Sequence, residues 1–291
     1  MGAYERHPGR SGGWNVERLV CVPTVRIVGP GRAGSSLAGA LAGVGWCVAD
    51  PVRHGDDPRG AAADVDLCVV AVPDAAIAAV AARIDPVPST LVVHLAGALD
   101  ATVLARHPRR AALHPLASLP DPATGARTLA AGAWWAVDGD PGAELIVAAL
   151  GGRLVPVGPQ ARAAYHAAAC IAANHTVALL AQAERVAASA GLPAAPFYEL
   201  AAAAVANAAT VGAAAALTGP AARGDEITLR RHLDALDPAE RELYATLAGA
   251  AARLAGRLPN PPSPQLAPPN PLAPNRYRIG ANASAGGSPC R

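Results

Sequence analysis

Short apolar, strand-like runs alternate with alanine-rich runs of helical length from Thr24 to about Val157. The strand-like runs are TVRIV, WCVA, DLCVVAV, LVVH, AALH, WWAV and GRLVPV. Strands that alternate with helices form a parallel sheet with helices on both faces. Most of these runs are apolar on both faces, as burial between two helix layers requires. The alternation therefore predicts a doubly wound α/β domain over residues 24–157.

A different pattern begins near residue 160. Residues 161–191 form one run of helical length without proline. Further helix-like runs follow at 193–217, 226–236 and 238–258. We therefore expect an all-helical second domain over residues 160–258.

The two ends of the chain are expected to lie outside both domains. The segment from residue 259 has eight prolines in its first 17 residues and little to bury, so residues 259–291 are predicted to be a disordered tail. Residues 1–22 are predicted to be a flexible N-terminus.

Composition narrows the class of partner. The 291 residues carry a formal net charge of +2 and are 52% hydrophobic, which gives no general case for binding nucleic acid or an acidic membrane. Two uncharged stretches, 164–183 and 201–222, are mostly alanine and fit buried helices better than membrane spans. We expect a small-molecule partner.

Cysteines and the N-terminus indicate the compartment. The five cysteines show no Cys-x-x-Cys spacing, so neither a disulfide framework nor a metal site is expected. The first residues lack the apolar core of a signal peptide. Both features favour a reduced, cytoplasmic protein.

The first strand-like run leads into the turn VGPGRAG, which opens a helix-like run. Glycine at the first, third and sixth positions allows a tight turn, close approach of a pyrophosphate, and close packing of helix on strand. The helix N-terminus then offers free amides to phosphates. The turn predicts a Rossmann-like dinucleotide site, whose residues are Gly29, Pro30, Gly31, Arg32, Ala33 and Gly34.

The residues after the second strand select the dinucleotide. An acid there binds the ribose hydroxyls of NAD, whereas an arginine accommodates the 2′-phosphate of NADP. Arg53 lies nearest the expected strand tip, so NADP is preferred. Asp50 becomes the NAD residue if the strand is shorter, and solvated loop charges are the remaining interpretation. At the end of the third strand, Val72 and Pro73 are expected to face the cofactor.

Six motifs in order carry a resemblance that covers residues 24–256. They are VGPGRAG, VVAVPD, VVHLAGALD, LHPLASL, YHAAACIAANH and LTGPAARGD. Together they resemble a bacterial family of predicted oxidoreductases that join a Rossmann-like domain to a helical C-terminal domain of unknown function. That family is similar to ketopantoate reductase, pyrroline-5-carboxylate reductase and prephenate dehydrogenase. The resemblance implies NAD(P)-dependent hydride transfer, a substrate held against the helical domain, and a homodimer formed through that domain.

The chain departs from this pattern in two places. Leu95 and Ala96 stand where a serine or threonine is usual after the fourth strand. Ketopantoate reductase uses as its acid a lysine that lies four residues before an asparagine. Here Cys170 occupies the position four residues before Asn174, and the chain contains no lysine. A lysine acid is therefore excluded.

Histidines are the candidate acids. His166 lies two helical turns before Asn174, and imidazole titrates near neutrality, so this pair is predicted to bind a carbonyl oxygen. His114 is the alternative, because it precedes Pro115, expected to stop the strand, and resembles the His-Pro motif of prephenate dehydrogenases. His94 is predicted to be structural. The competing interpretation is that His166 and His175 fill polar gaps in a helical core.

The loop LTGPAARGD supplies the candidate substrate anchor. Arg223 suits a carboxylate, and Thr218 adds a donor. Alternatively, the loop only begins a helix, with Asp225 as its cap. The sequence thus favours an NAD(P)-dependent oxidoreductase acting on a small oxo or imino acid. A noncatalytic nucleotide-binding regulator and a deazaflavin-dependent reductase remain the alternatives.

Overall fold

The computed structural model describes residues 22–259, which form two compact units divided between Ala181 and Gln182. The segments predicted as flexible, 1–22 and 259–291, lie outside the described residues except for Val22 and Pro259. The predicted domain bounds stay a prediction. Within the described residues, no helix has the length and apolar character needed to span a membrane.

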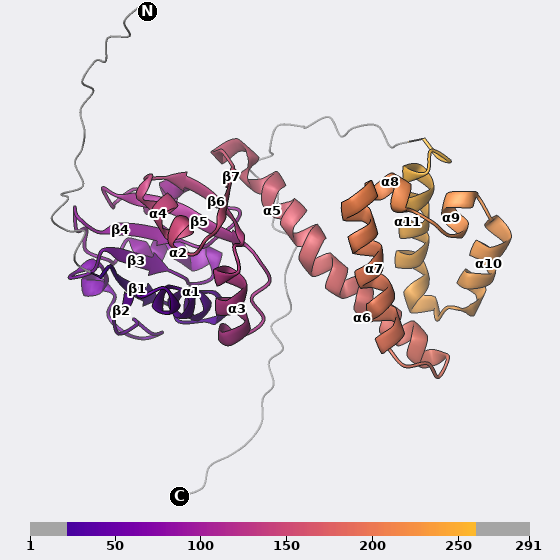
Figure 1. The fold of residues 1–291 in the computed structure, drawn as a ribbon, viewed down its shortest axis with the longest axis horizontal. Coiled ribbons are helices and arrows are strands. Elements are labelled where there is room, and N and C mark those ends of the chain that lie inside the picture. Colours follow the sequence, from indigo (N-terminus) through magenta and orange to yellow (C-terminus); the bar gives the residue numbers. More distant parts are fainter. Residues whose placement is uncertain (1–21, 260–291) are drawn as a thin grey trace, which may run out of the picture. The chain divides into compact units, whose positions relative to one another are not determined.

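The first unit contains a seven-stranded sheet in the order β2-β1-β3-β4-β5-β6-β7 (Figure 1). Its strands are β1 (Thr24–Val28), β2 (Cys47–Val48), β3 (Leu67–Val70), β4 (Leu91–His94), β5 (Arg110–Leu116), β6 (Trp134–Gly139) and β7 (Arg153–Pro156). Each lies within, or extends slightly beyond, a predicted strand-like run. The predicted Rossmann-like fold with helices on both faces is confirmed.

One strand pairing differs from the expected parallel sheet. β6 pairs antiparallel with β5, and the ladder continues to Leu116 opposite Trp134. The prediction that Pro115 stops the strand is therefore wrong. An antiparallel ladder uses only every second amide toward a given neighbour, so proline is accommodated. Toward β4 the pairing ends at Ala112, which leaves His114 beyond that ladder.

Two apolar cores lie on the two faces of the sheet because side chains alternate along each strand. Leu67 and Val69 of β3 belong to one core, and Cys68 and Val70 to the other. The first core is covered by α1 (Arg32–Gly43), α3 (Pro122–Ala130) and α4 (Gly142–Ala149). The second is covered by η2 (Arg59–Ala62), α2 (Asp74–Ala81) and η3 (Ala101–Leu104).

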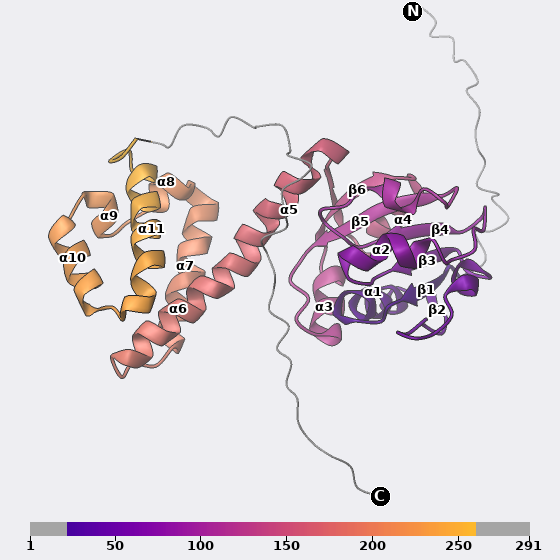
Figure 2. The same ribbon diagram turned by 180° about the vertical axis from the view of Figure 1, so that it is seen from behind.

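Small residues bring two helices of the first layer together. α1 and α3 lie side by side in both views (Figure 1, Figure 2). A Cβ atom added to Gly125 would lie 2.0 Å from the hydroxyl oxygen of Ser36, so only glycine permits this approach. α1 is thereby held with its N-terminus at the carboxyl edge of the sheet.

The predicted long helix is confirmed as a continuous helical stretch from Arg162 to Ser189. It consists of α5 (Arg162–Cys170), the π-helical segment η5 (Ile171–His175) and α6 (Thr176–Ser189), and it follows η4 (Pro159–Ala161). The π segment was not foreseen. It contains Ala172, Ala173 and Asn174, which line the cavity described below.

The other predicted helices are present in the second unit. They are α7 (Ala195–Val211), α8 (Ala213–Ala216), α9 (Pro220–Arg223), α10 (Glu226–Ala235) and α11 (Pro238–Leu254). The run predicted as one helix at 193–217 is divided at Gly212, whose φ of 85° ends α7. Gln182 donates to the carbonyl of Glu240 at 3.0 Å, which fixes the C-terminal part of α6 against α11.

Candidate functional site

The glycine turn has the geometry of a pyrophosphate cradle. Gly29 has a φ of 87°, and an added Cβ would lie 2.8 Å from a methyl group of Val72. An added Cβ on Gly34 would lie 2.7 Å from the Gly29 carbonyl oxygen, so α1 packs directly on the turn. Gly31 has no atom within 4 Å of its absent side chain, and α1 has no side-chain cap. The Gly31 amide donates to the Gly29 carbonyl oxygen at 2.8 Å, so the open space at Gly31 adjoins the uncapped start of α1, which fits a dinucleotide phosphate.

The second strand places Arg53 at the level of this turn. Val52 pairs with Val28, and its carbonyl accepts from the Gly29 amide at 2.9 Å. Arg53 comes next, is exposed, and donates its backbone amide to Asp56 at 2.7 Å. Asp50 lies two residues before Val52, short of the sheet edge. This register favours Arg53 over Asp50 as the residue beside the ribose.

The third strand contributes the predicted Val72 and Pro73. Ala71 donates to the Val28 carbonyl at 2.8 Å, which brings the end of β3 next to the glycine turn. Pro73 is the residue before α2, and Val72 fills the space beside Gly29. Both residues therefore lie at the carboxyl edge where open α/β sheets bind ligands.

A cluster of aromatic side chains occupies the same edge. His114 of β5 accepts or donates a hydrogen bond at 2.7 Å between its Nδ1 and the hydroxyl of Tyr165 on α5. The His114 and His166 rings meet edge to face, with centroids 5.7 Å apart. A Cβ on Gly97 would lie 2.5 Å from the His166 ring and 2.9 Å from Nε2 of His114. Glycine in the turn after β4 therefore leaves room for both imidazoles.

Burial makes the His114 imidazole neutral. Its pKa is lowered to about 4, chiefly by burial and then by His166, Arg162 and His94. Burial also raises the pKa of the Tyr165 hydroxyl, while the positive charge of Arg162 opposes that rise. At neutral pH the pair thus holds two protons, one on the imidazole and one on the phenol. Such a pair can donate a hydrogen bond to an oxygen or nitrogen atom.

A cavity of about 560 Å³ lies next to this cluster. Its lining includes the predicted residues His114, His166 and Asn174. Cys170 joins them, with its sulfur 3.9 Å from Nε2 of His166 and 4.0 Å from the Asn174 amide nitrogen. Four alanines of α5 and η5 supply apolar surface: Ala168, Ala169, Ala172 and Ala173. Asn174 lies within the π segment, a feature common at functional sites.

Other predicted residues lie elsewhere. His94 is fully buried, accepts from the Ala96 amide at Nδ1, and has Nε2 3.0 Å from the Asp100 carbonyl oxygen, so its structural role is supported. His175 is exposed. Thr218 and Arg223 belong to the second unit and are exposed, and their substrate role stays a prediction. Asp225 accepts from the Thr228 amide at 3.0 Å, so it does cap α10.

Sequence reasoning missed Tyr165, Gly97 and Arg162. Tyr165 adjoins His166 in the motif YHAAACIAANH, so its neighbourhood was a usable signal. Gly97 looked like an ordinary turn residue, because its contact with two histidines joins three distant segments. Arg162 is 1% exposed although it is charged, and nothing in the sequence around it indicates burial.

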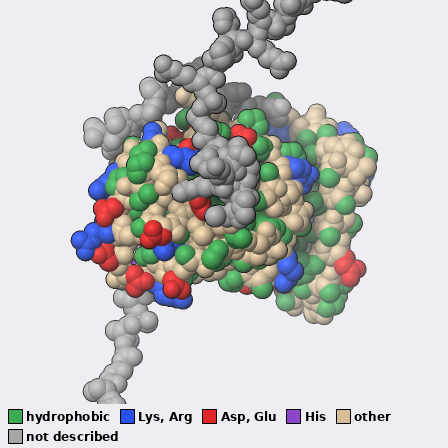
Figure 3. All heavy atoms as spheres, turned by 60° about the vertical axis from the view of Figure 1, so that its left-hand side comes forward, with side chains coloured by type: hydrophobic (Ala, Val, Ile, Leu, Met, Phe, Trp, Pro, Cys, Tyr) green, Lys and Arg blue, Asp and Glu red, His purple; other side chains and the backbone are tan. Residues whose placement is uncertain are grey.

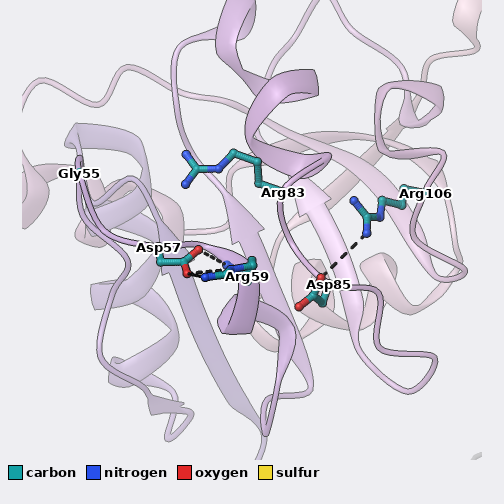
Figure 4. Close-up of a pocket in the computed structure, with 6 residues that line it drawn as sticks. All are labelled: Gly55, Asp57, Arg59, Arg83, Asp85 and Arg106. Carbon is teal, nitrogen blue, oxygen red and sulfur yellow. Dashed lines mark hydrogen bonds and ion pairs between the residues drawn. The ribbon is translucent and has the colours of Figure 1, made fainter.

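A second hollow lies elsewhere in the first unit, near the C-terminal end of α2 (Figure 4). Its lining comprises Gly55, Asp57, Arg59, Arg83, Asp85 and Arg106. Asp57 pairs with Arg59 at 2.6 Å, and Asp85 with Arg106 at 3.9 Å. These are exposed pairs, whose contribution to binding or stability is small. On the face drawn in Figure 3, acidic and basic side chains are likewise interspersed.

The fold has solved relatives. The chain is similar to a Bacteroides fragilis protein proposed to be an NADP oxidoreductase, with a TM-score of 0.67, 19% identity, and coverage of 80% of this chain and 98% of that one. It is similar to a Streptomyces aurantiacus imine reductase, with a TM-score of 0.58, 16% identity, and coverage of 79% and 93%. It is also similar to a Myxococcus stipitatus imine reductase in complex with NADP+, with a TM-score of 0.54, 18% identity, and coverage of 80% of this chain and 93% of that one.

Sequence comparison adds a family. No curated protein matches the chain. Residues 135–251 match the family described as a domain of unknown function, DUF2520, which runs from β6 to α11. This match agrees with the resemblance found in the motifs. The first residues of the matched segment belong to β6 and β7, the last two strands of the Rossmann-like sheet.

Proposed function

We propose that this protein is an NADP-dependent reductase that acts on the carbonyl or imine carbon of a small molecule, with NAD as the weaker cofactor. One observation carries the proposal: the glycine turn and the His114 cluster lie at the same edge of the sheet. β1, β3, β4 and β5 run parallel, so their carboxyl ends meet there. The solved relatives that bind NADP+ or reduce imines support the same class.

The glycine turn and Arg53 hold the nucleotide in this proposal. The amides at the start of α1 bind the pyrophosphate, and the Arg53 guanidinium pairs with the 2′-phosphate. When bound, NADPH supplies a hydride to the substrate carbon. The protein's own task is to place that carbon and to supply a proton.

The His114 cluster delivers the proton. Nε2 of His114 lies beside Gly97 in a side chain that lines the cavity, while Nδ1 is engaged by the Tyr165 hydroxyl. An Nε2–H group there donates to the substrate heteroatom as negative charge develops on it. His166 and Asn174 add donors. Thr218 and Arg223 remain our proposed anchors for a substrate carboxylate.

The test follows NADPH oxidation with a panel of oxo acids, neutral ketones and cyclic imines. For any substrate that is reduced, His114→Gln is expected to lower kcat about 100-fold, since removing a general acid costs that order of magnitude. The matched control is His232→Gln, because His232 also bonds a tyrosine, Tyr244, at 2.6 Å but belongs to the second unit.

The control must keep full activity. Equal losses in both variants would contradict the assignment of His114. NADPH binding with no oxidation across the panel would favour the noncatalytic regulator. Binding of neither nicotinamide cofactor would favour the deazaflavin alternative.

A further inference from the structure

Arg162 is a buried charge without a partner. Its side chain is 1% exposed, and its three guanidinium nitrogens have no hydrogen-bond partner among the described residues. Removing a charge from water costs free energy that paired groups recover through hydrogen bonds, and Arg162 recovers none that way. Burial accordingly lowers the pKa of its guanidinium. A fold that keeps such a residue gives up stability for some other property.

Arg162 begins α5, one helical turn before Tyr165 and His166. Residues three and four apart on a helix are neighbours, so Arg162 shares a face with the side chains that contact His114. The charged and titratable groups facing this region come from five elements: His94 from β4, Asp100 from the turn before η3, His114 from β5, Asp138 from β6, and Tyr165 and His166 from α5.

The two carboxylates in this set are already engaged. Asp138 accepts from the Ala101 amide at 3.0 Å, and Asp100 accepts from the Thr102 amide at 2.8 Å. Neither forms an ion pair with Arg162 in the described part of the chain. The guanidinium thus has no hydrogen-bonded counterion in the described part of the chain, and Asp138 and Asp100 act on it only through their charge.

We propose that Arg162 is the charge that stabilises the phenolate left on Tyr165 after the Tyr165–His114 pair gives a proton to the reduced substrate. This inference rests on the proposed reductase function. The proton on Nε2 of His114 moves to the substrate heteroatom, and the Tyr165 hydroxyl proton moves to Nδ1. His114 is neutral before and after, and Tyr165 becomes a phenolate that regains a proton from water.

Arg162 stabilises the site more during the proton transfer than before it. Before transfer, Arg162 faces two neutral groups and gains nothing from them. As the phenolate forms, the same guanidinium acquires an opposite charge in a site with little water. An interaction that strengthens only as charge develops accelerates the reaction. Arg162 thus acts through Tyr165, as a positioning residue, and does not itself touch the substrate.

The first test uses the full chain without nucleotide or substrate. Arg162→Met replaces a buried unpaired cation with an apolar side chain of similar length, so the melting temperature is expected to stay equal or rise. In the same variant, NMR titration is expected to show a His114 pKa above the wild-type value of about 4, because one cation near it is gone. The matched control is Arg26→Met, which removes three carbonyl contacts at 2.8–3.2 Å and should destabilise.

Activity provides the second test. Arg162→Met is expected to lower kcat at least tenfold with an unchanged NADPH Kd, and Arg162→Lys to restore part of the loss because it keeps the charge. A destabilised or unfolded Arg162→Met protein, or an unmoved His114 pKa, would overturn the inference whatever the cofactor result. Failure to bind NADPH would instead overturn the reductase proposal, so the two failures are distinguishable.

Discussion

At the residue scale, the site depends on what surrounds each imidazole. His94, His114 and His166 all lie at the carboxyl edge of the sheet, yet only two of them line the cavity. Both ring nitrogens of His94 form hydrogen bonds with backbone groups of the turn that follows β4. The sequence already predicts a structural role for His94, and these hydrogen bonds support that role.

Gly97 gives a sharp residue-scale prediction. Its backbone tolerates alanine, but the added Cβ would lie 2.5 Å from the His166 ring, so both imidazoles must move. Gly97→Ala is expected to abolish most reductase activity while NADPH affinity changes less than threefold. Steady-state kinetics and a nucleotide titration measure the two effects. Unchanged kcat would show that the cluster is not positioned as described.

The His114 pKa predicts how stability depends on pH. The pKa at which His114 takes up its second ring proton is about 4 in the folded protein and 6.5 in an unfolded chain. The unfolded state holds more protons between these values, so the free energy of unfolding falls as pH drops from about 6.5 toward 4. Denaturant unfolding across this window should show a smaller fall in His114→Phe. The same fall in both proteins would exclude His114 as its cause.

At the element scale, sequence predicts what depends on local pattern. The seven strands follow from apolar runs, and β1 and β4 have the predicted bounds. The direction of β6 does not follow, because a helix-containing connection permits either direction. The π segment at 171–175 is also invisible to spacing, since it inserts a residue without changing composition. Such features arise from packing between segments distant in sequence.

The π segment yields the element-scale prediction. Deleting Ala173 would allow a regular α-helix from Arg162 to Ser189 and would turn Asn174 away from its place in the cavity. The variant is expected to keep or raise its helix stability in thermal melts but to lose activity at least tenfold. NADPH binding serves as the internal control and should persist. Retained activity would mean that the distortion has no part in the site.

At the scale of the whole molecule, the helical unit lacks a core of its own. Only Gln182, Ala187 and Ala221 are buried among its described residues. Leu200 and Val205 of α7 are 66% and 62% exposed, as is Ile227 of α10 at 65%. Exposed apolar helices of this kind mark interaction surfaces. This pattern supports the homodimer predicted from the resemblance, which stays a prediction.

The dimer prediction is tested by light scattering on the purified chain. Wild type is expected at twice the monomer mass of 29.0 kDa. Leu200→Glu combined with Val205→Glu should give monomers, because charges cannot be buried in such an interface. Val44→Glu, at an exposed apolar position of the first unit, is the matched control and should remain dimeric. A monomeric wild type would contradict the prediction.

The central claim is that the glycine turn binds NADP, and a nucleotide titration of Gly31→Ala tests it most directly. Gly31 has open space around it, so alanine leaves the fold intact but intrudes on a pyrophosphate. We expect NADPH affinity to fall at least tenfold, about 1.4 kcal/mol, with an unchanged melting temperature. Gly43→Ala, at an equally open position of α1, should change neither. Equal NADPH affinity in wild type and Gly31→Ala would contradict the account.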